Sequence, residues 1–392
     1  MIHSTLPISI LLLAACAATP RSAPAPTKTA PSSPRAAEPL SSYAVGYATF
    51  TVSRGNGREL PAAVWYPAEP SDAPAIQYLQ AIPGIARAAA PVAGGGPFPV
   101  VALSHGSGGV KESAAYLAER LAAAGYIVAA VDHIGDTFRT FDMSRRKEIT
   151  RERPRDISAL LDYLAAPAAA ELRWLAEAAD LEHVAVYGHS FGGYTALALA
   201  GARVAPTQLW RDQCAATPND FACALLDPAQ AEPMRFRDPR VDVVIPAATA
   251  GWPLFGADGT AAVETPVLLL TGGQDVDTPT ASQARPIYDH LRTERWLIEL
   301  SLGTHYTFIH ICPFVNVLPE PMAVNARPGC APDAPLPVEA AHDFLADVVV
   351  TFVDASLRDR ADARAELAPD RLRARAAGKK ITVETFSAAA QK

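Results

Sequence analysis

The hydrophobic and polar positions from about residue 42 onward form short apolar runs that alternate with helical patterns. The last six runs are rich in β-branched residues and mostly lack polar alternation, which is typical of strands buried on both faces of a sheet. The first two runs lie close together in sequence and predict an antiparallel edge. In all, eight runs predict strands, at residues 47–53, 60–67, 98–104, 126–132, 183–188, 241–246, 266–272 and 295–301.

Four stretches with helical periodicity separate the later runs, at residues 113–124, 154–165, 190–200 and 279–292. A chain in which strands and helices alternate in this way builds a largely parallel sheet with helices on both faces. We therefore predict one α/β domain over residues 42–357, built on an eight-stranded and mostly parallel sheet.

Two proline-rich stretches interrupt the alternation. Residues 202–240 and 312–337 carry two cysteines each, and we expect both to be insertions that form cap segments or pocket walls over one edge of the sheet. A helical pattern over residues 338–357 is expected to pack back on the sheet. Residues 358–392 are highly charged and predict a C-terminal tail, either an exposed helix or loose chain.

The N-terminal residues have the pattern of a targeting segment. The apolar run 6–15 is too short to cross a bilayer as a helix, which needs about 20 residues. It ends at Cys16, and Leu13-Ala14-Ala15-Cys16 resembles the lipobox of bacterial lipoproteins, in which the cysteine becomes the acylated N-terminus. We predict a signal peptide over residues 1–16; an ordinary cleaved signal with a chance cysteine is the alternative.

Residues 17–41 are rich in Pro, Ala and Ser. Such a segment cannot bury enough apolar surface to fold, and it predicts an extended tether. A lipid on Cys16 followed by this tether would hold the folded domain at a membrane. The expected location is therefore the bacterial cell envelope, in the periplasm or at the outer membrane.

Composition and charge exclude two broad classes of protein. Of the 392 residues, 49% are apolar and 19% are charged, so a large core can be buried and disorder over most of the chain is excluded. The net charge is −7 with basic and acidic residues interspersed, and this argues against nucleic acid as a partner. We find no signal for an oligomeric state.

Four cysteines remain if Cys16 is lipidated, namely Cys214, Cys223, Cys312 and Cys330. Three pairings are possible, and the sequence alone does not choose among them. The pairing of nearest neighbours, Cys214–Cys223 and Cys312–Cys330, would close two loops in an oxidising compartment. Free buried thiols are the alternative, and zinc is weakly supported because no C-x-x-C spacing is present.

The strongest local motif is Gly188-His189-Ser190-Phe191-Gly192-Gly193, which follows a predicted strand and opens a predicted helix. This is the context of a G-x-S-x-G nucleophile elbow, in which a serine on a tight turn projects its hydroxyl above the sheet. The helix N-terminus then presents free backbone N–H groups to the site. Ser190 is therefore the predicted nucleophile, and a glycine-rich turn with an idle serine is the alternative.

A serine hydroxyl needs a base, and the base needs an orienting carboxylate. In chains with this elbow the order is serine, acid, histidine. Asp275 follows the run 266–272, at the strand end where open α/β sheets place their sites, and Asp277 is the competing candidate. His305 follows the run 295–301 and is the predicted base.

The neighbouring histidines fit the role of the base less well. His310 lies inside an apolar run and is interpreted as a core histidine, while His183 and His189 precede the serine.

A glycine-rich loop, His105-Gly106-Ser107-Gly108-Gly109, ends the run 98–104. Such a loop can turn backbone N–H groups toward the elbow and, with the N–H of Phe191, hold a developing oxyanion, an interaction worth about 3–4 kcal/mol per donor. Ser107, directly after the His-Gly pair, is the predicted second donor. The alternatives are a plain turn and a phosphate cradle, but the P-loop pattern is absent.

Taken together, residues 43–355 resemble the bacterial branch of the platelet-activating-factor acetylhydrolase and dienelactone hydrolase-like proteins, within the α/β-hydrolase superfamily. The resemblance implies the α/β-hydrolase fold with inserted cap segments. It also implies a serine esterase with Ser190, Asp275 and His305 as triad and with Ser107 and Phe191 as oxyanion donors. Its motifs are residues 57–61, 64–67, 103–109, 132–133, 153–157, 188–193, 272–279 and 303–308.

Two departures from the family pattern bear on the site. Eukaryotic acetylhydrolases carry the acid after the sixth strand, whereas residues 244–247 of this chain read Val-Ile-Pro-Ala, so the acid has to come from Asp275. Dienelactone hydrolases use a cysteine nucleophile, and this elbow carries a serine.

The leading interpretation is a carboxylic ester hydrolase that acts on a small-molecule, lipid or polymer ester through an acyl-enzyme on Ser190, without cofactor or metal. A polyester or amide hydrolase or an acyltransferase could use the same triad, and a non-catalytic envelope binding protein is the remaining alternative. The cluster of Asp132, His133 and Asp136 could in principle bind a cation, but a loop with a local hydrogen-bonded pair is the preferred interpretation.

Overall fold

The computed structural model describes residues 42–55, 57–318, 320–331, 333–379 and 381–390. The predicted signal peptide, the lipidation candidate Cys16 and the predicted tether lie outside these residues. Among the helices of the described part, none combines the length and the apolar character that a membrane span requires.

One mixed sheet organises the described part of the chain, with eleven strands in the order β11-β10-β9-β8-β7-β5-β6-β2-β1-β4-β3. Its six central strands run parallel to one another. These are β5 (Phe98–Ser104), β6 (Ile127–Val131), β7 (Ala179–His189), β8 (Val241–Ala247), β9 (Val267–Gly272) and β10 (Arg295–Leu300). Each of the six lies on a run for which a strand was predicted.

The antiparallel edge is also present, and it is larger than predicted. Strands β1 (Ala44–Ser53) and β2 (Glu59–Ala68) pair antiparallel over their whole length, and β2 pairs antiparallel with β6. Two further strands lie beyond β1: β4 (Ile82–Ala88) pairs parallel with β1, and β3 (Ala75–Tyr78) pairs antiparallel with β4. They escaped prediction because β3 is only four residues long and β4 contains a Pro-Gly pair, which is unusual inside a strand.

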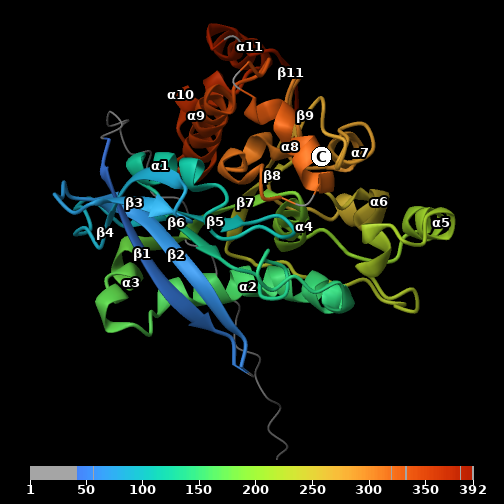
Figure 1. The fold of residues 1–392 in the computed structure, drawn as a ribbon, viewed down its shortest axis with the longest axis horizontal. Helices are drawn as coiled ribbons and strands as arrows, with labels where there is room; N and C mark the ends of the chain where they lie inside the picture. The colour runs from blue at the N-terminus through green and yellow to red at the C-terminus, as the bar shows by residue number, and fades with distance from the viewer. Residues whose placement is uncertain (1–41, 56, 319, 332, 380, 391–392) are drawn as a thin grey trace, which may run out of the picture. The chain divides into compact units, whose positions relative to one another are not determined.

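Burial on both faces explains why the central strands lack polar alternation. All residues of β5, β6 and β9 are buried. In β5, Val100 and Ala102 point into one apolar core, while Val101 and Leu103 point into the other. Helices α2 (Arg146–Ala165) and α4 (Phe191–Leu199) contribute to the first core, and α1 (Ala115–Ala123) and α9 (Val338–Leu357) to the second. Figure 1 shows α1 and α9 on one side of the sheet and α2 on the other.

Helix α2 begins at Arg146, eight residues before the predicted start at Pro154, so the proline lies inside the helix. A proline inside a helix leaves the carbonyl four residues earlier without its usual N–H donor. Here that carbonyl belongs to Thr150, and the hydroxyl of Tyr194 donates to it at 3.0 Å. The hydrogen bond from the neighbouring helix therefore allows α2 to continue through Pro154.

Other predicted helices are present with changed bounds. Helix α7 (Ala284–His290) is shorter than the predicted 279–292, since residues 280–283 form a turn. Outside the two insertions and the C-terminal segment, α3 (Leu175–Ala178) and α6 (Trp252–Thr260) are α-helices that were not predicted.

Each of the two insertions contains a helix and a disulfide. In the first, Cys214–Cys223 joins α5 (Gln208–Ala216) to the 3-10 helix η3 (Phe221–Ala224). In the second, Cys312–Cys330 joins the 3-10 helix η5 (Cys312–Phe314) to α8 (Glu320–Cys330). The cysteines are thus paired with their nearest neighbours in sequence, one of the three pairings that the sequence allowed.

The charged segment after residue 357, predicted as an exposed helix or loose chain, contains helices and also a strand that was not predicted. Residues 358–390 include helices α10 (Ala361–Glu366) and α11 (Pro369–Gly378) and strand β11 (Val383–Ala388), which pairs antiparallel with all six residues of β10. The strand and the packing of this segment were not predicted because its few buried apolar residues are interspersed with many charged residues. The buried apolar residues are Ala363, Leu367, Leu372, Ala376, Ile381 and Val383.

Buried histidines give the fold a dependence on pH. Burial lowers the pKa of His133 and His310 to about 4 and the pKa of His189 and His342 to about 3. Each would titrate near pH 6.5 in the unfolded chain. Below that pH the unfolded chain therefore binds protons that the folded chain does not.

We predict that the free energy of unfolding falls as the pH is lowered from 6.5 to about 4, by up to about 1.4 kcal/mol per pH unit for each buried histidine. Urea unfolding at pH 7, 6 and 5 measures this slope. His342→Phe keeps an aromatic ring stacked on Tyr116 and should reduce the slope by one histidine's share. Equal stability at pH 7 and pH 5 would contradict the prediction.

Candidate active site

Ser190 lies on a tight turn between β7 and α4, and its backbone conformation is unusual. Its φ of 54° and ψ of −117° place a non-glycine residue in a sparsely populated region, as is found in strained turns at functional sites. Two glycines make the turn possible. A side chain on Gly188 would collide with the backbone of Gly192, and a side chain on Gly192 would collide with the carbonyl of Ser104. The backbones of β7, α4 and the end of β5 therefore meet in direct contact.

The structure brings Ser190, His305 and Asp275 together in one hydrogen-bonded line. His305 Nε2 lies 3.0 Å from Ser190 Oγ, and His305 Nδ1 lies 2.9 Å from Asp275 Oδ2. The distances fit a neutral imidazole whose Nδ1–H donates to the carboxylate and whose Nε2 accepts from the serine hydroxyl. Asp275 follows β9, and His305 opens the 3-10 helix η4 (His305–Phe308) after β10. The three side chains therefore come from the carboxyl ends of three parallel strands.

The carboxylate of Asp275 is buried and well supplied with hydrogen bonds. Its Oδ1 accepts the backbone N–H groups of Asp277 and Thr278 at 2.9 and 2.7 Å, and its Oδ2 accepts from Thr278 Oγ1 at 2.7 Å. Burial alone would raise the pKa of Asp275, but the hydrogen bonds from His305 and Thr278 outweigh burial and leave this pKa below its ordinary value. The group is therefore ionised at neutral pH and is held in one orientation toward His305.

Asp277, the competing candidate for the acid, is exposed and lies beside this line, with a carboxylate oxygen within 4.8 Å of the ligand atoms of Asp275 and His305. Its Oδ1 accepts a hydrogen bond from Asn325 Nδ2 at 3.0 Å. The structure thus gives the two carboxylates different partners, His305 for Asp275 and helix α8 for Asp277.

The glycine-rich loop after β5 lies beside Ser190. A Cβ built on Gly106 would lie 2.9 Å from His189 Nδ1 and 3.2 Å from Ser190 Cβ, so a larger residue here would push the loop away from the elbow. Phe191 is the first residue of α4, and its backbone N–H has no acceptor within the helix. The two segments that carry the predicted oxyanion donors, Ser107 and Phe191, therefore border the serine from adjacent elements.

A buried ionic network holds the glycine-rich loop from behind, and the sequence analysis missed it. The hydroxyl of Ser107 donates to Asp136 Oδ1 at 2.8 Å, and the N–H of Gly108 donates to the backbone carbonyl of Asp136 at 2.9 Å. Asp136 also accepts hydrogen bonds from Arg146 and, at 2.5 Å, from Arg153 Nη1. Arg153 in turn donates to the backbone carbonyl of His105. Asp136 is thus a support for the loop rather than part of an isolated local pair.

A second serine–histidine–aspartate line lies inside the same network. Ser104 Oγ is 2.9 Å from His133 Nε2, and His133 Nδ1 is 3.0 Å from Asp156 Oδ2. These three side chains are buried, and Asp156 also pairs with Arg54 and Arg58. No substrate can reach Ser104, so this line has a structural role, and the alignment of residue types alone does not define a catalytic site.

His189, the residue before Ser190, supports the base instead of competing with it. Its Nε2–H donates to the backbone carbonyl of His305 at 2.8 Å. Burial, and then the neighbouring His305, lower the pKa of His189 to about 3, so the ring is neutral at neutral pH. His310 is also largely buried, and its Nε2 accepts the backbone N–H of Tyr116 at 3.1 Å, as expected for a core histidine.

Within the described residues, one group has the spacing of potential metal ligands, namely Asp275, Asp277 and His305, whose ligand atoms lie within 4.8 Å of one another. Two of its members already form a hydrogen bond with each other. These residues are those of the candidate active site described above and its neighbour Asp277, so we do not assign a metal site to them. The cluster of Asp132, His133 and Asp136, considered for a cation, is occupied by contacts to Lys111, Asp156, Arg146 and Arg153.

Comparisons with known proteins agree with this architecture. A family model described as the alpha/beta hydrolase fold matches residues 99–208, which include the glycine-rich loop and the elbow. A solved structure of ferulic acid esterase from Streptomyces cinnamoneus superposes with a TM-score of 0.56 at 23% identity, covering 84% of this chain and 94% of that one. The chain has the α/β-hydrolase fold.

The curated relatives match over a smaller part of the chain. Cutinase est1 of Thermobifida alba is 26% identical over 208 residues, which are 53% of this chain and 53% of the relative. Bis(hydroxyethyl) terephthalate hydrolase of Streptomyces coelicolor is 27% identical over 214 residues, which are 54% and 52% of the two chains. The chain thus spans about half the length of these relatives.

We predict that Asp136→Asn lowers the free energy of unfolding by about 3–5 kcal/mol, because it leaves two buried arginines facing a neutral amide. Urea unfolding measures the loss. Asp162→Asn is the matched control, since Asp162 pairs with Arg240 at 2.7 Å while its side chain is 72% exposed. The control should lose less than about 1 kcal/mol. Equal losses in the two variants would show that Arg146 and Arg153 do not depend on Asp136 as their buried counter-charge.

Proposed function

We propose that the protein is a serine-dependent carboxylic ester hydrolase that works through an acyl-enzyme on Ser190. The observation that carries this proposal is the position of His305, with one ring nitrogen on Ser190 Oγ and the other on the buried Asp275 carboxylate. That geometry supplies a nucleophile, a base and an orienting acid in one line.

In the first half of the proposed reaction, Ser190 Oγ attacks the ester carbonyl carbon while His305 Nε2 takes the hydroxyl proton. The negative charge that develops on the carbonyl oxygen is met by the backbone N–H groups of Ser107 and Phe191, each worth about 3–4 kcal/mol at such a site. His305 then returns the proton to the alcohol oxygen as the carbon–oxygen bond breaks. The alcohol leaves, and the acyl group stays on Ser190.

In the second half, a water molecule takes the place of the alcohol. His305 removes a proton from the water as it attacks the acyl carbon, and the same two N–H groups stabilise the second oxyanion. The bond to Ser190 Oγ breaks, and the proton passes from His305 back to the serine. The carboxylic acid is released, and Asp275 keeps His305 in one tautomer throughout.

The names of the relatives support an ester as substrate, because they include cutinases, a ferulic acid esterase and a hydrolase of bis(hydroxyethyl) terephthalate. We also propose that the protein is related to the bacterial acetylhydrolase and dienelactone hydrolase-like group, which the motifs given above support. We further propose that a lipid on Cys16 anchors the protein in the cell envelope, which the sequence around Cys16 supports.

We predict that Ser190→Ala lowers the turnover of p-nitrophenyl acetate by more than about a thousandfold, because removal of the nucleophile leaves only substrate binding and oxyanion stabilisation. The variant should also lose labelling by a fluorophosphonate probe and keep its circular dichroism spectrum. Residual turnover within tenfold of the unaltered protein would contradict the assignment of Ser190.

For the acid, we predict that Asp275→Asn lowers kcat by about ten-thousandfold, because an amide leaves His305 in the wrong tautomer. Asp277→Asn is the matched control and should lower kcat by less than about tenfold, since its carboxylate contacts Asn325 instead of His305. Steady-state kinetics of the two variants decide between them. The reverse ranking would move the acid to Asp277.

A further inference from the structure

A cavity of about 130 Å³ opens beside His305. Gln274, Val276 and His305 lie on one side of it, and Val324, Asn325 and Pro328 of helix α8 lie on the other. The cavity is therefore built between the catalytic loops and the second insertion, a segment with no role in the reaction steps above.

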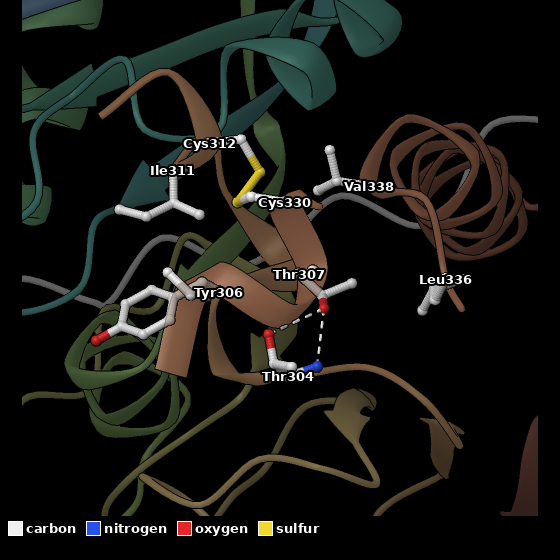
Figure 2. A pocket seen from close by; sticks show the side chains of 10 residues that line it. Thr304, Tyr306, Thr307, Ile311, Cys312, Cys330, Leu336 and Val338 are labelled. Carbon is white, nitrogen blue, oxygen red and sulfur yellow. Dashed lines mark hydrogen bonds between the residues drawn. A yellow bond between two sulfur atoms is a disulfide. The ribbon is translucent and has the colours of Figure 1, made fainter. Parts of the chain in front are cut away.

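Helix α8 is a fixed wall of this cavity. The Cys312–Cys330 disulfide ties its C-terminal end to η5, as Figure 2 shows. A small apolar core of Tyr306, Ile309, Ile311 and Ala326 fills the space between α8 and the segment that follows His305. The void left beneath α8 measures about 10 Å³, which is room for about one water molecule. Asn325 adds a hydrogen bond from α8 to Asp277.

The position of the cavity indicates which part of an ester it would hold. The carbonyl carbon of a bound ester must face Ser190, and its oxygen must face the N–H groups of Ser107 and Phe191. The lining includes none of these three residues, but it includes His305, which gives its proton to the leaving oxygen. A group in this cavity is therefore attached to the oxygen that leaves, and so it belongs to the alcohol.

The size and lining of the cavity restrict that alcohol. An engineered protein cavity of about 150 Å³ binds benzene, so a space of about 130 Å³ accepts a group of about one ring or a short chain. The lining combines the apolar Val276, Val324 and Pro328 with the amides of Gln274 and Asn325, and it holds no lysine, arginine or carboxylate. These surroundings suit an uncharged alcohol.

On the basis of the proposed esterase activity, we propose that this cavity is the alcohol-binding subsite and that α8 sets its size. The preferred substrates are then esters of uncharged alcohols no larger than about a single ring, and the acyl part lies outside the cavity. Val324 lines the cavity, and we assign it as a specificity-determining residue. Its side chain is about half exposed, so a larger residue can be accommodated at this position and the assignment can be tested by substitution.

Two series of esters test this proposal. One keeps the acetyl group and varies the alcohol from methyl to benzyl, and the other keeps the methyl alcohol and varies the acyl chain from acetyl to hexanoyl. Val324→Trp fills the cavity and should lower the ratio of kcat/KM for benzyl over methyl acetate by about tenfold or more. Val324→Ala enlarges the cavity and should shift the ratio the other way. The acyl-chain profile should follow the unaltered protein in both variants.

Val317→Trp is the matched control, because Val317 belongs to the same insertion, is 81% exposed and does not line the cavity. This control should leave both profiles unchanged. If Val324→Trp alters the acyl profile instead, or behaves like Val317→Trp, the alcohol subsite is overturned while the esterase proposal stands. If the unaltered protein hydrolyses none of the esters, the proposed function itself fails and this inference fails with it.

Discussion

The close approach of helix α4 to the end of strand β5 is the constraint on which the rest of the site depends. Gly192 lies against the carbonyl of Ser104 with no room for a side chain between them. That contact forces the chain through the strained conformation at Ser190, and it also brings the glycine-rich loop next to the serine. One steric condition thus places both the hydroxyl group and the neighbouring backbone N–H groups at the same end of the sheet.

The loop after β5 has few side chains of its own with which to hold a shape, and charged groups beneath it supply the rigidity. Asp136 is shared between Ser107, Gly108 and two arginines, and its contacts with the arginines are fully buried. Ionic groups lose much of their hydration when they are buried, so such a cluster is a poor means of stabilising a fold in itself. The cluster instead fixes the geometry of the loop. Both carboxylate oxygens of Asp136 accept hydrogen bonds from particular donors, and only one loop conformation makes all of these hydrogen bonds.

The sequence contained enough information to predict the six central parallel strands and the pair β1–β2, because strands buried on both faces leave uninterrupted apolar runs. It also pointed to Ser190, Asp275 and His305, which directly follow three of these runs, whereas β3, β4 and β11 were not predicted. It did not reveal the Asp136 network, since that cluster joins residues from separate elements and only the fold shows which charges meet. Helix α2 continues through Pro154 because Tyr194, 40 positions further along, replaces the missing donor. The C-terminal segment was missed for a related reason: its few buried apolar residues are diluted by charged ones that face solvent.

The pairing of β11 with β10 has a consequence for how copies of the molecule behave toward one another. Strand β10 presents Trp296, Leu297 and Ile298 in sequence, and an open edge with this composition would be a template for adding a strand from another chain. Strand β11 occupies that edge along its full length, and at the opposite end the sheet stops at β3, with four residues and an irregular register. A second molecule would therefore meet β11 at one end of the sheet and the short, irregular β3 at the other, and the apolar run of β10 is covered by the charged C-terminal segment.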